Sequence, residues 1–286
     1  MGRRYAVFAI AGLLGMAACT EKGPEQAAAA AAPVASVAPQ EITVHARDFG
    51  FDAPDTIPAG LTTIRLINDG PGLHHGQLLR IDSSKTFADA VAAIPQQINF
   101  PRWLVPVGGP NAVAAGDTSV VTQELAPGNY MWICFVDMPG GVPHYKKGME
   151  RAFTVVPSTA PAATPPTADI SVTLRNYAFE FSTPLTAGHH TFKVMTADTS
   201  SQSHELVLIQ LAPGKTGEDV LGWLQKPEGP PPGRPLGGVA DLTRSMPVYF
   251  SANLTPGNYL LICFDPDFND GKPHFMHGMM ETVSVS

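Results

Sequence analysis

Residues 125–135 read LAPGNYMWICF, and residues 254–264 read LTPGNYLLICF. In both segments a Pro-Gly turn precedes an apolar strand that ends at a cysteine, Cys134 or Cys263. A turn followed by tyrosine at this position is typical of the tyrosine corner of Greek-key β-sandwiches, in which the phenol bonds to upstream backbone. The repetition therefore predicts two sandwiches of one kind in a single chain, each with its cysteine at one pole.

The residues upstream of these segments repeat in the same order. Alternating apolar and polar residues predict an opening strand at 42–45 and again at 170–174. Polar residues suited to capping precede a short helical pattern at 85–94 and at 215–224. Charged residues make up only 15% of the chain, whereas glycine and proline number 27 and 28, which favours short strands joined by many turns. We predict an all-β protein of two tandem Greek-key domains, each with a short helical insert.

Changes in composition divide the chain into five parts. The alanine and proline runs before residue 41 bury no face, and the segment PSTAPAATPPT between the two repeats is a semi-extended spacer. The predicted parts are a signal peptide at 1–18, a lipidated Cys19 with a flexible tether at 19–40, a first domain at 41–156, a Pro-rich linker at 157–167 and a second domain at 168–286.

The amino-terminal segment has the features of an export signal. Arg3 and Arg4 precede an apolar stretch, and the small pair Ala17-Ala18 precedes Cys19. This pattern resembles a bacterial lipobox, which implies cleavage before Cys19 and acylation of that residue; an ordinary secretory signal is the alternative. The apolar stretch is too short to favour a permanent membrane span. We expect a periplasmic protein held by a lipid anchor at the outer membrane or at the periplasmic face of the inner membrane, or otherwise a secreted protein.

Each repeat carries two histidines, one cysteine and one methionine at matched intervals. The first histidine lies 59 residues before the cysteine in both copies (134 − 75 and 263 − 204), and the second lies five before the methionine (149 − 144 and 279 − 274). Two imidazoles, a thiolate and a thioether are the ligand set of a mononuclear copper electron-transfer site. We predict one copper per domain, up to two in all, on His75, Cys134, His144 and Met149 and on His204, Cys263, His274 and Met279.

Two assignments within these sets have alternatives. Exported proteins commonly pair their cysteines in disulfides, so a disulfide across the domains or a free buried thiol competes with a metal thiolate. One cysteine per repeat, with Cys19 reserved for the lipid, favours the metal. His74 adjoins His75, but Ser203 precedes His204, so the repeat favours His75 as the ligand and gives His74 a surface or supporting role.

The motif Tyr-x-x-x-Cys followed by His-x-x-x-Gly-Met, with an upstream histidine opening a strand, resembles the cupredoxins, in particular plastocyanin-like blue copper proteins. The segments HYKKGM at 144–149 and HFMHGM at 274–279 are similar to the plastocyanin ending, and Asn-Asp-Gly at 68–70 is similar to its turn before the first ligand. The resemblance covers nearly all of both domains. It implies two equatorial histidines, an equatorial thiolate and a weak axial methionine in each domain.

One feature departs from that family. Its members place the second histidine only a few residues after the cysteine, whereas here the intervals are ten and eleven residues (144 − 134 and 274 − 263). A loop that bulges outward would return the histidine to the metal. An altered geometry, an open coordination position or a site without metal are the alternatives.

The first functional hypothesis is a membrane-tethered copper protein that transfers electrons. A copper chaperone, store or sensor without electron transfer is the second, and a metal-free structural subunit of a membrane complex is the third. Two cupredoxin domains also build copper nitrite reductases and small laccases, which commonly have extra histidines beside the cysteine. Here Ile133 and Phe135 flank one cysteine, and Ile262 and Phe264 flank the other. We therefore expect that the protein is not an enzyme.

The charge of the chain bears on its partners. It holds 18 basic and 25 acidic residues, and removal of Arg3 and Arg4 with the signal leaves 16 against 25, a net charge of −9. Such a surface repels nucleic acid and favours a redox partner with a basic docking surface, such as a c-type cytochrome or a membrane oxidoreductase.

Overall fold

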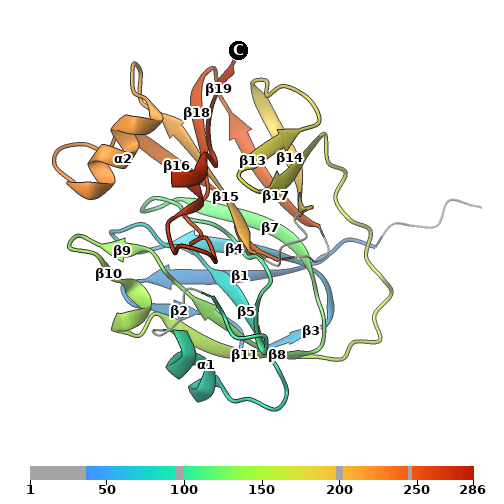
Figure 1. The fold of residues 1–286 in the computed structure, drawn as a ribbon. Coiled ribbons are helices and arrows are strands. Elements are labelled where there is room, and N and C mark those ends of the chain that lie inside the picture. The colour runs from blue at the N-terminus through green and yellow to red at the C-terminus, as the bar shows by residue number, and fades with distance from the viewer. Residues whose placement is uncertain (1–36, 95–98, 198–201, 244–246) are drawn as a thin grey trace, which may run out of the picture. The chain divides into compact units, whose positions relative to one another are not determined.

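A computed structural model describes residues 37–94, 99–197, 202–243 and 247–286. The predicted signal peptide, Cys19 and nearly all of the tether lie outside these described residues. Ser36–Ser286 form one compact unit, shown in Figure 1. The domain boundaries predicted from the sequence stay a prediction, and residues 157–167 contain neither helix nor strand.

The first sandwich packs two sheets face to face. One face holds β2, β1, β4 and β7, and the other holds β3, β11, β8, β5 and β6 in that order. A small hairpin of β9 and β10 extends from it. The strands are β1 (Gln40–Arg47), β2 (Gly50–Asp52), β3 (Thr56–Pro58), β4 (Gly60–Asn68), β5 (Gln77–Ile81), β6 (Leu104–Pro106), β7 (Thr118–Leu125), β8 (Gly128–Ile133), β9 (Asp137–Met138), β10 (Val142–Pro143) and β11 (Glu150–Val156).

The second sandwich repeats this arrangement. One face holds β13, β12, β14 and β17, and the other holds β16, β15, β18 and β19. The predicted all-β fold of two sandwiches is confirmed. The strands are β12 (Ile170–Arg175), β13 (Ala178–Phe181), β14 (Gly188–Thr196), β15 (His204–Leu211), β16 (Gly233–Leu242), β17 (Val248–Leu254), β18 (Gly257–Ile262) and β19 (Met280–Val285).

Alternation of buried and half-buried residues explains why these segments are strands. Along β4 the side chains of Ile64 and Leu66 are fully buried while those between them are half-buried. β1 runs parallel to β4, and β12 runs parallel to β14 with the same kind of register, Val172 opposite Val194. A parallel pair at the start of each repeat brings both opening strands to one face of their sandwich.

The two predicted helical inserts are confirmed as α1 (Phe87–Ala93) and α2 (Gly217–Gln225). Each begins with a capping box formed by a threonine and the aspartate three residues after it. The threonine hydroxyl accepts from the backbone N–H of that aspartate, and the aspartate carboxylate accepts from the backbone N–H of the threonine. The pairs are Thr86 with Asp89 and Thr216 with Asp219. Among the described residues, no helix is long and apolar enough to cross a membrane.

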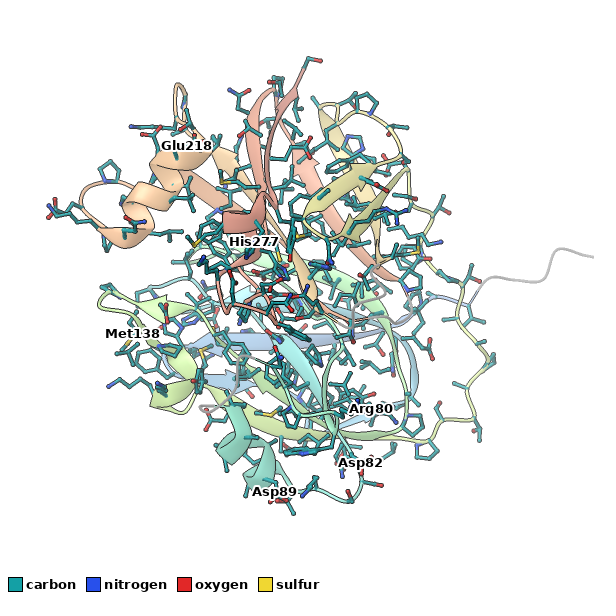
Figure 2. All side chains as sticks on the ribbon, in the orientation of Figure 1. Arg80, Asp82, Asp89, Met138, Glu218 and His277 are labelled. Atoms are coloured by element: carbon teal, nitrogen blue, oxygen red, sulfur yellow. The ribbon has the colours of Figure 1, made fainter. Side chains whose placement is uncertain are left out.

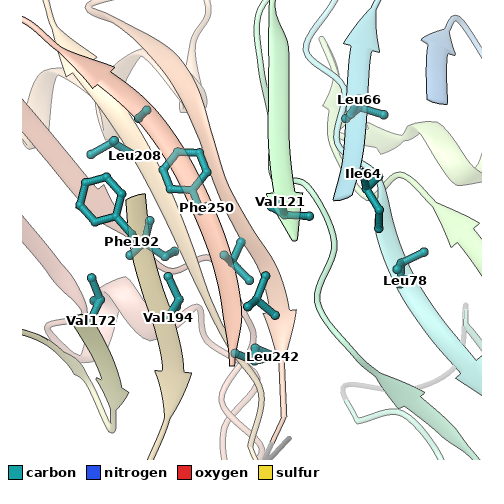
Figure 3. Close-up of a cluster of buried hydrophobic side chains, with 14 of the residues drawn as sticks. Ile64, Leu66, Leu78, Val121, Val172, Phe192, Val194, Leu208, Leu242 and Phe250 are labelled. Carbon is teal, nitrogen blue, oxygen red and sulfur yellow. The ribbon is translucent and has the colours of Figure 1, made fainter. Parts of the chain in front are cut away.

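The two sandwiches share a sheet. β7 pairs antiparallel with β17, at Val121 opposite Phe250, which joins four strands of each sandwich into one eight-stranded sheet. Buried side chains from both sandwiches consequently form one continuous apolar cluster, and Figure 3 shows Val121 on β7 and Phe250 on β17 within it. Burial of about 25 cal/mol per Å² of apolar surface makes this seam a stabilising part of the core.

A second seam runs along residues 107–113, which bond to β5 on one side and to β16 on the other. The carbonyl of Gly108 accepts from the N–H of Leu78 at 2.8 Å, and the N–H of Gly108 donates to the backbone carbonyl of Asp241 at 2.8 Å. The backbones approach so closely that a Cβ at Gly109 would lie 2.2 Å from the Gly76 carbonyl, and one at Gly238 would lie 1.9 Å from the Leu206 carbonyl. Both glycines also have positive φ, so a larger residue is excluded at either position.

The predicted tyrosine corners are confirmed. The phenol of Tyr130 donates to the Ala126 carbonyl at 2.8 Å, and that of Tyr259 donates to the Thr255 carbonyl at 2.9 Å. Both rings are buried while the hydrogen bonds lie at the edge of the core, where each fixes the turn before the cysteine strand.

We predict that Tyr130→Phe lowers the free energy of unfolding by about 1 kcal/mol, because the Ala126 carbonyl loses its buried donor. Urea unfolding followed by fluorescence measures the change. Tyr249→Phe is the matched control, since Tyr249 is equally buried but its phenol has no hydrogen-bond partner among the described residues. Equal losses in the two variants would contradict a structural role for the corner.

Candidate metal centres

Backbone hydrogen bonds hold the end of the cysteine strand against the turn that carries the second histidine and the methionine. The N–H of Cys134 donates to the backbone carbonyl of Met149 at 3.2 Å, and the carbonyl of Cys134 accepts from the N–H of Tyr145 at 3.0 Å. The N–H of Met149 donates to the backbone carbonyl of His144 at 3.3 Å. The second sandwich repeats all three bonds among Cys263, Phe275, Met279 and His274, at 3.0–3.1 Å. These two sets of three bonds are called the backbone clamps.

The long segments between cysteine and histidine therefore leave the site intact. In the first sandwich the β9–β10 hairpin turns outward, and the N–H of His144 bonds back to the Val136 carbonyl at 2.9 Å. In the second, the N–H of His274 bonds to the Asp265 carbonyl at 2.9 Å, and Pro266 pairs with Pro273. Each segment bulges outward and returns its histidine to the cysteine.

A short 3₁₀ turn then connects histidine to methionine. The turns are η2 (His144–Lys147) and η3 (His274–His277), and each ends at a glycine with positive φ, 95° at Gly148 and 106° at Gly278. Glycine adopts this left-handed conformation at no steric cost, which explains the Gly-Met pair in both repeats. The side chains of Met149 and Met279 are fully buried in the same apolar cluster as the two cysteines.

In the amino-terminal sandwich the structure brings His74, rather than the predicted His75, together with Cys134 and His144. Nδ1 of His74 lies 3.1 Å from Nδ1 of His144, and Sγ of Cys134 lies 3.6 Å from that same nitrogen. His75 instead accepts the N–H of Phe135 on Nε2 at 2.7 Å.

In the carboxyl-terminal sandwich the structure brings together three of the four residues predicted for the site, His204, Cys263 and His274. Nδ1 of His204 lies 3.1 Å from Nδ1 of His274, and Sγ of Cys263 lies 3.4 Å from Nδ1 of His274. His, Cys and His are buried in both sites, and their ligand atoms converge within 4.8 Å of one another. The structure thus contains two copies of one constellation, and neither described cysteine is in a disulfide.

The distances fit a small metal ion. Two nitrogens at about 2.0 Å from a metal, with an angle of about 100° between them, lie about 3.1 Å apart. A sulfur at about 2.3 Å and a nitrogen at about 2.0 Å, separated by about 105–115°, lie about 3.4–3.6 Å apart. The observed separations of 3.1, 3.4 and 3.6 Å match these values without movement of the side chains.

The outer nitrogens of the histidines have side-chain partners. Nε2 of His74 bonds to Oδ1 of Asp48 at 2.6 Å, and Nε2 of His204 bonds to Oδ1 of Asn176 at 3.0 Å. Nε2 of His274 bonds to Oε1 of Gln202 at 3.2 Å. An oxygen acceptor on Nε2 places the ring proton there, which leaves Nδ1 with a free lone pair for a metal.

Polar side chains lie between the two sites. The N–H groups of Phe135 and Phe264, each directly after a cysteine, bond to His75 and to Oε1 of Glu205 respectively, at 2.7 and 2.9 Å. Asn111, from the seam at 107–113, donates to Oε2 of Glu205 at 2.7 Å, and its side chain lies near that of His75. His75 and Glu205 hold equivalent positions, and we call His75, Asn111 and Glu205 together the Asn111 bridge.

Aromatic rings cover the second histidine of each site. Phe49 meets His144 edge-on at 5.2 Å between ring centroids, and Tyr177 lies 5.3 Å from His274 and 4.9 Å from His277. Phe49 and Tyr177 each follow the opening strand of their repeat. His277 and Met138, labelled in Figure 2, lie on η3 and on the β9–β10 hairpin.

Burial sets the protonation of the site residues. It lowers the pKa of His74 and His144, and it lowers that of His274 to about 4, so these imidazoles are neutral at pH 7. Burial raises the pKa of the Cys134 thiol to about 12 and that of Cys263 well above its usual value. Without a metal both cysteines are therefore protonated thiols at neutral pH.

No protein family and no curated protein sequence matches this chain. Solved structures similar to it include auracyanin from Roseiflexus castenholzii, at 20% identity and a TM-score of 0.28, over 42% of this chain and 100% of that one. The blue copper oxidase from Nitrosomonas europaea is 14% identical with a TM-score of 0.27, over 86% of each chain. The copper-containing nitrite reductase from Thermus scotoductus is 13% identical with a TM-score of 0.26, over 87% of this chain and 62% of that one.

These structures agree with a cupredoxin-like fold and leave the particular family open. They also correct one prediction. We expected that the protein is not an enzyme, and this expectation is wrong, because an oxidase and a nitrite reductase are among the similar structures. The missing histidines beside the cysteines do not exclude catalysis.

We predict that His74→Gln abolishes metal binding at the amino-terminal site, whereas His75→Gln preserves it. The glutamine carbonyl at position 75 still accepts the Phe135 N–H, but no side chain replaces Nδ1 of His74. Copper per chain, measured by elemental analysis after desalting, falls from two to one in the first variant only. His189→Ala, an exposed residue of β14, is the control. Loss of copper in His75→Gln alone would restore the original assignment.

We also predict that Zn²⁺, a redox-inactive probe, displaces close to one proton per site at pH 7.5. The thiols are protonated because burial raises their pKa, whereas the imidazoles are already neutral. Between about pH 7 and pH 9, which lies below the raised pKa of the thiols, apparent affinity should rise about tenfold per site for each pH unit. Titration calorimetry in buffers of different ionisation enthalpy counts the protons, and a count near zero would contradict a buried neutral thiol.

Proposed function

We propose that the protein binds one copper ion in each sandwich and transfers electrons through them. The observation that carries this proposal is the duplicated constellation of two Nδ1 atoms 3.1 Å apart with a cysteine sulfur 3.4–3.6 Å from one of them. Apart from a metal ion, nothing requires two imidazoles and a thiol to converge in a buried position twice in one chain.

The donor types favour copper among the metals that such a site accepts. Thiolate and imidazole together suit both Cu(I) and Cu(II), and a long thioether bond tunes the potential between them. His74, Cys134 and His144 would hold the first ion, with the buried Met149 sulfur as a further donor. In the second sandwich His204, Cys263 and His274 would take these roles, with the buried Met279 sulfur as a further donor. Copper supplies a one-electron couple; the protein supplies a fixed ligand frame.

The rigidity of that frame supports electron transfer rather than metal delivery. The backbone clamps fix cysteine, histidine and methionine against one another, and all their side chains are buried. A frame that keeps its shape in both oxidation states needs little reorganisation when an electron moves. A delivery protein would instead need an open route for its metal, and the ring contacts of Phe49 and Tyr177 cover the second histidines.

The Asn111 bridge supports exchange of electrons between the two ions. The residue after each cysteine donates its N–H to one end of the bridge, to His75 or to Glu205, and Asn111 lies between these two side chains. The shared sheet holds both ends of the bridge in one unit. Two centres joined in this way would act as a short relay between an electron donor and an acceptor.

We further propose that the protein is exported and anchored through a lipid on Cys19, and that its partners are redox proteins with basic surfaces. The lipobox-like segment and the excess of acidic residues support these two points. The second inter-ligand loop contributes less to docking than its composition indicates, because Asp265 and Asp267 are buried. Asp270, bonded to Lys272 and His277, remains at the surface.

The test is to load the purified protein with Cu(II) and record its visible spectrum, its copper content and its voltammogram. We expect an intense thiolate-to-copper band, two copper ions per chain and a reversible couple. Cys134→Ser and Cys263→Ser should each remove one ion and about half of the band, because each deletes the thiolate of one site.

The outcomes separate the competing functions. Tightly bound copper with no reversible couple would favour a chaperone, store or sensor. A colourless protein without copper would favour a structural subunit. Full copper content in the double cysteine variant would refute the assignment of the ligands.

A further inference from the structure

Three buried carboxylates that belong to neither histidine–cysteine site meet where the two sandwiches adjoin. They are Glu205 at the start of β15, Asp241 near the end of β16 and Asp265 after β18, and each is less than a tenth exposed. One oxygen from each lies within 4.8 Å of the other two. Within the described residues none of the three forms an ion pair with lysine or arginine.

A side chain from the first sandwich also points into this cluster. Gln77 on β5 is 1% exposed, and its amide nitrogen donates to Oδ2 of Asp241 at 2.8 Å. The amide oxygen beside that nitrogen has no hydrogen-bond partner, and neither has Oδ2 of Asp265. A buried oxygen without a donor costs about 1–3 kcal/mol, so the unpartnered oxygens of Gln77 and of Asp265 favour a positively charged group at this cluster.

We propose that this cluster binds a divalent cation that prefers oxygen ligands, Ca²⁺ foremost, through Gln77, Glu205, Asp241 and Asp265. Carboxylate and amide oxygens are the donors that Ca²⁺ takes, at about 2.3–2.6 Å. Oxygens up to 4.8 Å apart span such an ion. Mg²⁺ is less suitable, because it retains several waters and this site is enclosed.

The cation would join the two sandwiches. Gln77 belongs to the first and the three carboxylates belong to the second, so one ion adds a contact across the seam at 107–113. It is separate from copper binding, because soft thiolate and imidazole ligands and hard oxygen ligands select different ions.

The experiment uses copper-free protein that has been treated with a chelator. Ca²⁺ is added, bound Ca²⁺ is counted by equilibrium dialysis, and thermal unfolding is followed by circular dichroism. We expect one Ca²⁺ per chain and a rise of about 5–10 °C in Tm at a hundredfold excess over Kd. Asp241→Asn should lose both effects, and Asp52→Asn, an exposed charge on β2, should retain both.

A second variant keeps the test decisive if Asp241→Asn fails to fold. Gln77→Met removes only the neutral ligand and should weaken Ca²⁺ affinity by about tenfold. No Ca²⁺ bound by the wild-type chain would overturn the proposal and indicate that the carboxylates share protons instead. Equal affinity in wild type and both variants would place the ion elsewhere and overturn it as well. Neither result depends on whether copper binds.

Discussion

The backbone clamps are the constraint on which both sites depend. Three hydrogen bonds fix the cysteine, the second histidine and the methionine relative to one another, whatever the length of chain between cysteine and histidine. A ten- or eleven-residue excursion is therefore tolerated, because the entropic cost of a longer surface loop grows only slowly with its length. The ligands are set by the strand end and the 3₁₀ turn, and the intervening hairpin is free to vary.

Local patterns were sufficient to predict the fold class, both helices and the tyrosine corners, because each depends on residues close in sequence. The prediction of His75 assumed equal spacing to the cysteine, whereas the structure places His74 beside His144 and keeps the spacing between the paired histidines, 70 residues in both copies (144 − 74 and 274 − 204). That interval was available in the sequence. The oxygen partners Asp48 and Asn176 were a second signal, since they too hold equivalent positions.

The contacts between the sandwiches could not be predicted in the same way. The pairing of β7 with β17 and the seam at 107–113 join residues more than one hundred positions apart, and no periodicity marks them. For this reason the burial of Asp265 and Asp267, in a polar segment after Cys263, could not be predicted from the sequence. Whether a charged side chain is buried depends on which distant segments pack against it, and the composition of a single strand does not reveal those segments.

The partner of each first histidine has diverged between the repeats. Asp48 offers a carboxylate to His74, whereas Asn176 offers a neutral amide to His204. An imidazole bonded to an anion is a stronger electron donor than one bonded to an amide. The two constellations thus share a shape, but their first histidines have partners of different charge. Two ions held there would differ in the electron donation they receive, so an electron would rest at one of them in preference to the other.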